Sequence, residues 1–355
     1  MNVAHVSNPR RTALRPARRM QGLTLVELMV AIVLGLLILG GVISIFVSNR
    51  QAFRTTEELS RMQENARTAF ELMARTLREA GGSACGANLP TAQVINSSAQ
   101  TAWLADWMQG GLRGYGPNQA FPAKAFGSNP AQRVAGTPAL VMMHGDGNTA
   151  FQIVSHDPAA KSFTVGATGH GFATGDILLA CDYLQAAIFQ TTAADPADTD
   201  IAYDAGGALS PGNCTSNLGL TPANESVQCP SVGGVHTFTT GQLMRLSAEA
   251  WYVGNYQRED GRAGRALYRV RLGSQGNVET EELIEGVEDL KLEYLLRNGS
   301  SLATSYVEAG SVTDWTQVVS VRVTLTFQGT ERTGTDGQAL RRQSIHVIGL
   351  RNRLS

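Results

Sequence analysis

Apolar side chains fill one continuous stretch near the start of the chain, residues 23–47, which only Thr24, Glu27 and Ser44 interrupt with polar groups. A helix needs about 20 such residues to cross the hydrocarbon core of a bilayer. This stretch therefore predicts a single membrane-spanning helix.

The helical pattern continues beyond the apolar stretch. No proline occurs between Pro16 and Pro90, so one helix can extend from residue 23 to Ala80 and end at the two glycines that follow. In residues 48–82, apolar side chains recur at three- and four-residue steps, which is typical of a helix with one buried face. This stripe comprises Leu59, Met62, Ala66, Ala69, Met73, Leu77 and Ala80. We expect it to dock on the chain's own globular part.

The remainder of the chain, residues 83–355, contains short apolar or alternating segments with turn residues between them, which predict an antiparallel sheet. The expected strands are 139–143, 151–154, 162–165, 176–180, 181–190, 249–253, 268–272, 290–296, 319–327 and 344–350. Two regions, 85–136 and 191–234, lack a clear period. The expected fold is α+β and resembles a lollipop, with a transmembrane half-helix (23–47), an amphipathic half-helix (48–82) and a globular head (83–355).

Charged residues around the apolar stretch give it a direction. Arg18 and Arg19 precede it, which holds that end in the cytoplasm and sends the head across the membrane. Glu27 lies one turn inside, where a charge costs about 2.5–3.5 kcal/mol on insertion scales, so a functional role is expected. The small residue Gly22 precedes the apolar run, whereas an ordinary signal peptide has its cleavage site after it.

The order of a basic leader, Gly22, the residues Leu-Thr-Leu-Val-Glu (23–27) and a long apolar helix resembles the class III signal peptide of type IV pilins and type II secretion pseudopilins. The resemblance implies that residues 1–22 are a leader. A prepilin peptidase would cut between Gly22 and Leu23 and methylate the new amino terminus. Glu27 would then neutralise the Leu23 amine of a neighbouring subunit, because a buried carboxylate is tolerated when it is paired.

The carboxy-terminal third resembles a narrower group. The segments LIEGVEDLKLEY (283–294), WTQVVSVRVTL (315–325) and the closing LRNR (350–353), with GDILLACDYLQAAIFQ (175–190), are similar to the PilW family of type IV pilus minor pilins. This implies a structural protein that is not an enzyme. It would join other minor pilins and the major pilin in an initiating complex at the pilus tip, with a PilY-type tip adhesin as a partner, and serve adhesion, twitching motility and DNA uptake.

The same resemblance implies a location and leaves two alternatives open. The protein would sit in the inner membrane with its head in the periplasm, and later at the pilus tip on the cell surface. A type II secretion pseudopilin of the GspJ kind would share the leader and the helix. A membrane-anchored periplasmic hydrolase is a further alternative, although its anchor would not need Glu27.

Net charge argues against one class of partner. The whole chain has a formal charge of −1, but residues 1–22 carry five arginines and no acid. Without them, 24 basic residues remain against 30 acidic ones. A mature chain of this balance lacks the basic character of a nucleic-acid-binding domain, so no nucleic acid contact is expected for the head.

Four cysteines, Cys85, Cys181, Cys214 and Cys229, all follow the membrane segment. An oxidising periplasm would favour disulfides, and four cysteines allow three pairings. We favour Cys214–Cys229, which closes a short loop rich in glycine, asparagine, serine and proline, together with Cys85–Cys181.

Cofactor and metal sites are not expected. The cysteines form no C-x-x-C and no histidine lies at ligand spacing to them, which argues against zinc. Asp146 and the trio Asp195, Asp198 and Asp200 could supply oxygen ligands to calcium, but neither forms a complete loop pattern, so solvated acidic turns are expected.

Overall fold

The long helix α1 is the first element of the protein. The computed structural model describes residues 24–97, 101–223, 225–231, 233–299, 301–334 and 336–353, and α1 comprises Leu25–Glu79. It ends before Gly81, whose φ of 72° lies in the left-handed region where glycine is favoured and helices commonly stop. The predicted end of the helix is thus confirmed. By its internal contacts the chain divides into two compact units, Met1–Thr56 and Glu57–Ser355.

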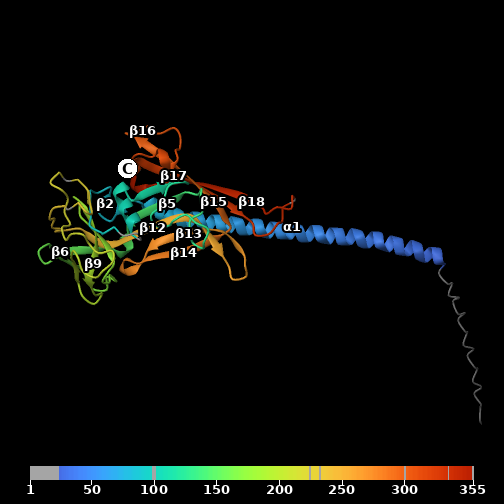
Figure 1. Cartoon of the computed structure of the whole chain (residues 1–355), viewed down its shortest axis with the longest axis horizontal. Helices are drawn as coiled ribbons and strands as arrows, with labels where there is room; N and C mark the ends of the chain where they lie inside the picture. The colour runs from blue at the N-terminus through green and yellow to red at the C-terminus, as the bar shows by residue number, and fades with distance from the viewer. Residues whose placement is uncertain are drawn as a thin grey trace, which may run out of the picture. The chain divides into compact units, whose positions relative to one another are not determined.

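The head is built from strands (Figure 1). They are β1 (Gly82–Ser83), β2 (Gly86–Ala87), β3 (Thr91–Gln93), β4 (Leu112–Tyr115), β5 (Ala139–Gly145), β6 (Phe151–Asp157), β7 (Ser162–Val165), β8 (Ile177–Cys181), β9 (Ala186–Ala194), β10 (Asp200–Tyr203), β11 (Val227–Gln228), β12 (Gln242–Gln257), β13 (Ala263–Leu272), β14 (Val278–Glu285), β15 (Val287–Asn298), β16 (Ser301–Leu302), β17 (Val318–Gln328) and β18 (Arg341–Gly349). Short 3₁₀ helices are η1 (Ala102–Gln109), η2 (Gly147–Thr149), η3 (Ser274–Gly276), η4 (Ala309–Ser311), η5 (Trp315–Gln317) and η6 (Arg351–Arg353).

These strands form a two-stranded, a twelve-stranded and a four-stranded sheet. The order of the large sheet is β11-β3-β9-β10-β7-β6-β12-β13-β14. Three further strands lie off this path: β4 pairs with β5, β5 pairs with β12, and β8 pairs with both β12 and β9. The small sheet has the order β16-β15-β17-β18. Pairing is antiparallel as expected, except that β3 runs parallel to both β9 and β11. These exceptions have two or three residues each and are joined by long connections, so no hairpin turn sets their direction.

Strand β5 shows why the centre of the large sheet reads as continuously apolar. All seven of its residues are buried. Leu140 and Met142 enter a core that also contains α1, whereas Val141 and Met143 enter a second core on the opposite face. A strand that is covered on both faces has no solvent side to carry polar residues, so alternation disappears.

The first of these cores contains the part of α1 that follows Glu57. It packs α1 against one face of the four-stranded sheet and one face of β5, β12 and β13. The predicted stripe is confirmed: Met62, Ala69, Met73, Leu77 and Ala80 are buried, and Leu59 and Ala66 are partly buried. A third core, rich in phenylalanine, lies under strands β6 to β10.

Candidate assembly site

The first described residues form a capped helix start. Thr24 precedes α1, and its side-chain oxygen accepts a hydrogen bond from the backbone N–H of Glu27 at 3.2 Å. A threonine in this position satisfies one of the free donors at a helix start. Gly22 and Leu23, the predicted processing residues, lie outside the described residues.

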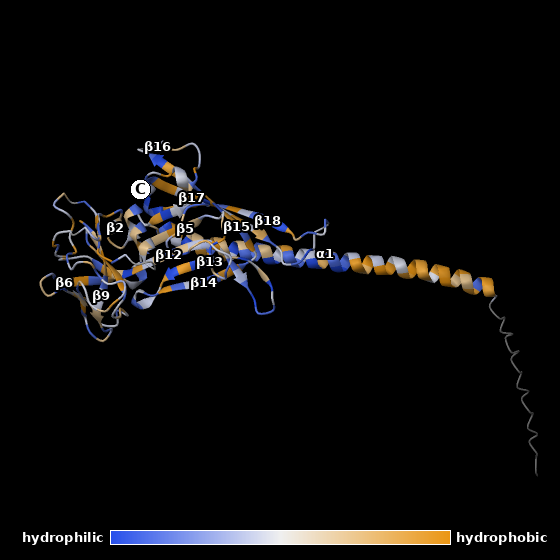
Figure 2. Cartoon of the chain, viewed as in Figure 1, coloured by the Kyte–Doolittle hydropathy of each residue, from blue (hydrophilic) through white to orange (hydrophobic). Residues whose placement is uncertain are grey.

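The first half of α1 exposes apolar surface all the way round (Figure 2). Among the residues that the structure describes, α1 is the one helix long and apolar enough to cross a membrane. A uniformly apolar exposed surface of this extent marks a membrane or protein contact. The protein is therefore membrane-anchored, with its head on the carboxy-terminal side of the anchor.

Glu27 is the one acidic residue on this apolar surface. It lies in the first turn of α1 and is exposed, and within the described part of the chain no cation contacts its carboxylate. Acids are favoured near a helix N-terminus by the macrodipole. In hydrocarbon, however, a carboxylate without a cationic partner remains costly. The geometry therefore leaves Glu27 available to a cation from outside the described chain.

The second half of α1 is held to the head by hydrogen bonds as well as by its apolar stripe. Glu58 is buried and its carboxylate accepts the backbone N–H of Thr330 at 2.6 Å. Further along, the hydroxyl of Thr76 donates to the carboxylate of Glu249 at 3.1 Å. These contacts fix the rotation of the second half of α1 about its axis and its position along that axis relative to the sheets, because each buried polar group must find its own partner.

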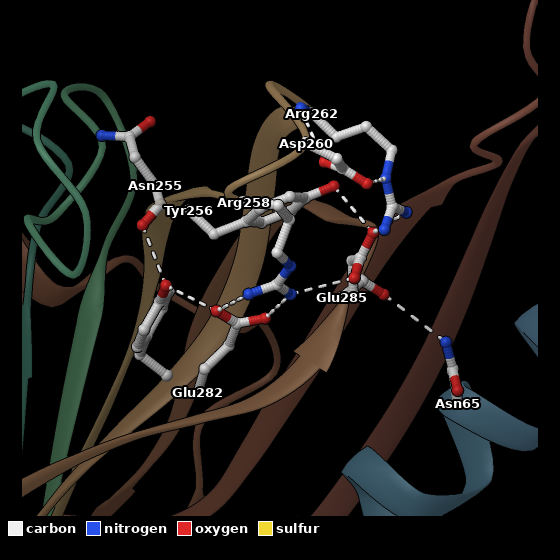
Figure 3. Close-up of polar contacts among 9 residues, drawn as sticks. Asn65, Asn255, Tyr256, Arg258, Asp260, Arg262, Glu282 and Glu285 are labelled. Atoms are coloured by element: carbon white, nitrogen blue, oxygen red, sulfur yellow. Dashed lines mark hydrogen bonds and ion pairs between the residues drawn. The ribbon is translucent and has the colours of Figure 1, made fainter.

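A cluster of alternating charges supports this attachment at the end of the β12–β13 hairpin. Figure 3 shows Arg258 between Glu282 and Glu285, with Asn65 of α1 reaching the same strand. The amide of Asn65 donates to the backbone oxygen of Glu285 at 3.4 Å, and the hydroxyl of Tyr256 donates to the Glu285 carboxylate at 2.9 Å.

Three residues of this cluster, Tyr256, Arg258 and Glu285, have pKa values shifted away from neutral pH. Hydrogen bonding to Arg258 lowers the pKa of Glu285, and the hydrogen bonds to Glu282 and then to Glu285 raise the pKa of the Arg258 guanidinium. Burial, followed by the hydrogen bond to Glu285, raises the pKa of Tyr256 to about 12. All three groups thus keep one protonation state at neutral pH, as a structural brace requires. A catalytic acid or base would instead need a pKa near the working pH.

Sequence reasoning missed the polar members of this attachment. These members are Glu58, Asn65 and Thr76. They lie among charged residues of a helix whose sequence predicts one buried and one solvent-exposed face. Two of them are spaced to share a face with the apolar stripe: Thr76 lies four residues before Ala80, and Glu58 lies four residues before Met62. That spacing was the available signal, since residues four apart share a helix face.

Both expected cysteine pairs are present as disulfides. Cys85 joins Cys181 across 96 residues, and Cys214 joins Cys229 across 15. The first connects the segment after α1 to the end of β8, and the second closes the loop-rich region between β10 and β12.

The aspartates considered as calcium ligands accept hydrogen bonds from backbone groups of their own turns. Asp195 accepts the backbone N–H of Ala197, and Asp146 accepts that of Asn148 at the start of η2. Among the described residues, no group of three or more histidine, cysteine, aspartate or glutamate side chains is placed to hold a metal ion.

Comparison with protein families identifies both ends of the chain. Residues 17–43 match the prokaryotic N-terminal methylation motif. Residues 250–352, from β12 to η6, match type IV pilus-assembly protein W, PilW. The chain is a PilW-like, prepilin-type protein. It is thus a minor pilin or assembly protein of the type IV pilus, and PilW proteins are structural components of that pilus. Neither the curated proteins nor the solved structures include a match to the chain.

The PilW match covers several of the strands that receive α1, although β5 lies outside it. It includes β15 and β17, whose inner faces pack on the helix, and β14, whose backbone accepts the hydrogen bond from Asn65. The methylation motif covers the helix start with Glu27. The two matched regions thus include the apolar start of the helix and much of the surface that receives its second half.

Proposed function

We propose that this PilW-like protein is a minor pilin of an initiating complex that primes type IV pilus assembly and then stays at the pilus tip. In this role it associates with other minor pilins and with the major pilin, and a PilY-type tip adhesin binds the complex. Adhesion, twitching motility and DNA uptake are the activities that such a pilus serves. The protein's own part is structural and not enzymatic.

The observation that carries this proposal is Glu27 on the exposed apolar surface of α1, within a methylation motif. Cleavage between Gly22 and Leu23 by a prepilin peptidase creates an amine one helical turn from Glu27, since residues four apart share a face. Apolar helices gain little from meeting each other in lipid, because the tails are as apolar as their side chains. A carboxylate–amine pair can therefore set the register between neighbouring subunits.

The two disulfides and the arginines before the helix support the proposed orientation. Arg18 and Arg19 favour the cytoplasmic side for the leader. Disulfides persist in oxidising compartments such as the periplasm. We therefore place the head in the periplasm before assembly and at the cell surface afterwards.

Replacing Glu27→Ala tests the proposal. The variant should insert into the membrane and fold its head normally, but its crosslinks to other minor pilins and the number of pili per cell should fall by roughly tenfold or more, as loss of the partner of a buried charge predicts. Ser44→Ala, on the same exposed segment, is the matched control and should behave as the wild type. Normal piliation and crosslinks in the Glu27→Ala cells would contradict the proposed role.

A further inference from the structure

Strand β18 is an edge of the four-stranded sheet that has no strand on its outer side among the described residues. It pairs with β17 over nine residues without a register shift. An edge strand presents unpaired N–H and C=O groups, which natural proteins cover with bulges, charges, prolines or very short strands. β18 contains no proline and no bulge, and its two arginines, Arg341 and Arg342, lie at its start, so the edge from Gln343 onward is left open.

Three other edge strands in the described part of the head, β11, β14 and β16, are guarded. β11 and β16 have two residues each. β14 is longer, but its glutamates are held by arginines of neighbouring strands, as in Glu279–Arg271. In β18, by contrast, the central residues Ile345 and Val347 are 59% and 57% exposed.

The two faces of β18 differ in what they meet. His346 stacks on Phe70 of α1 with ring centroids 4.1 Å apart, so this side faces the helix. Ile345 and Val347 alternate with it and point to the opposite side. Their cross-strand partners on β17 are Thr324 and Arg322, which are polar. Apolar surface therefore occurs on this face at the outer edge, where a further strand would continue the sheet.

The start of β18 carries charge without a counterion. Arg341 and Arg342 are both exposed, and neither forms an ion pair with any residue that the structure describes. Beside them a groove of about 260 Å³ runs between α1 and β18, lined by Met62, Phe70 and Arg342 among others. A strand added at this edge would have room for side chains in the groove and would meet two unpaired guanidinium groups.

We propose that β18 accepts an extended strand from the head of another pilin-type subunit, which would carry apolar residues opposite Ile345 and Val347 and a carboxylate opposite Arg341 or Arg342. Main-chain hydrogen bonds supply affinity in such strand addition, and alternate side chains supply specificity. The inference rests on the proposed function, because it names a partner for the same pilus subunit.

A second copy of this chain is the less suitable occupant. The carboxylates of its β14 edge already have arginine partners, such as Glu281 with Arg269. Pairing β18 with β18 would leave Arg341 and Arg342 without an acid. A different subunit with an acidic strand end satisfies both the edge and the charges.

Photo-crosslinking in pilus-producing cells tests the inference on the full chain. A benzophenone amino acid is placed at Ile345 or Val347, with Lys291 as the control, because Lys291 is exposed on β15 of the same sheet but is separated from β18 by β17. We expect positions 345 and 347 to give an adduct whose partner peptide is a strand of another pilin-type head, at several-fold higher yield than position 291. Equal yields, no adduct, or an adduct with a second copy would overturn the inference.

A charge substitution separates this inference from the proposed function. The double variant Ile345→Lys, Val347→Lys should lose the head-to-head adduct, measured from a third probe at Gln343, by roughly tenfold, as replacing anchor residues of an interface predicts. Thr326→Lys on the neighbouring strand should not. Helix crosslinks that depend on Glu27 should persist in both variants. If those crosslinks persist but the adduct is unchanged in the double variant, the inference about the β18 edge fails and the proposed function stands. If the wild type forms no Glu27-dependent crosslinks, the proposed function itself fails.

Discussion

His156 illustrates how a titratable residue is fixed inside the head. The backbone N–H of Phe238 donates to its Nδ1 at 3.2 Å, so Nδ1 carries no proton and Nε2 donates to the hydroxyl of Tyr203 at 2.7 Å. Its ring stacks on Phe163 with centroids 4.0 Å apart. Burial, with a smaller contribution from His236, lowers the pKa of His156 to about 4.

This shift predicts a loss of stability in mild acid. An unfolded histidine binds its proton near pH 6.5, whereas the folded one stays neutral until about pH 4. The contribution of His156 is therefore complete above about pH 6.5 and is lost as the pH falls toward 4. Between pH 7.5 and 5 we expect the unfolding free energy to drop by about 1–2 kcal/mol through this residue.

Urea unfolding of the detergent-solubilised chain at the two pH values measures the effect. His156→Gln should lose that part of the pH dependence, while His346→Gln, on the partly exposed ring beside Phe70, should retain it. An unchanged pH dependence in His156→Gln would contradict the assignment.

The sequence could not single out His156. Its six histidines are scattered, and burial of this one depends on Tyr203 and Phe238, which lie 47 and 82 residues away in the chain. Glu27 could be singled out, because an acid inside an apolar helix is anomalous without any tertiary context. The local sequence thus identifies a residue that is anomalous in its own segment, such as Glu27. It does not identify a residue such as His156, whose environment is formed by residues distant in the chain.

At the scale of elements, the second half of α1 is part of the head's core. Leu77→Ala should lower the unfolding free energy by about 2–5 kcal/mol. Leu77 is fully buried on the face of α1 that packs against the sheets, so its truncation leaves a cavity. Leu72→Ala, on the exposed side of the same helix, should cost less than about 1 kcal/mol. Denaturant unfolding compares the two, and equal losses would show that the helix is not docked through this face.

The two disulfides should differ in their effect on stability. In the chain-entropy account a bridge across 96 residues stabilises by about 4.7 kcal/mol and one across 15 by about 3 kcal/mol. Replacing Cys85 and Cys181 by serine should therefore destabilise more than replacing Cys214 and Cys229. Unfolding of each double variant, with thiol labelling of the native wild type, tests this. Free thiols in the untreated wild type, or the reverse ranking, would contradict it.

Elements with a strong local pattern were predictable. The alternation of Val319, Val321 and Val323 gave β17, and the absence of proline with the two closing glycines gave α1. β14 was missed because its sequence, VETEELIE, is rich in glutamate, which has a low preference for strands. It forms because arginines on β13, such as Arg269, pair with those glutamates across the strands.

At the scale of the whole molecule, the likeness to PilW and the fold class were readable from local sequence. The methylation motif and the PilW segments need only local sequence, and the family comparisons match both regions. The twelve-stranded sheet was not readable. Its order depends on pairings between segments such as β5 and β12, which lie about a hundred residues apart and share no local signal.

The central claim is that this chain is a processed pilus subunit, and the mass of its mature amino-terminal peptide tests it most directly. Mass spectrometry of the protein from sheared pili and from membranes should find a first residue Leu23 bearing one amino-terminal methyl group, with residues 1–22 absent. A protein in assembled pili that retains its leader, or that begins after residue 47, would contradict the account.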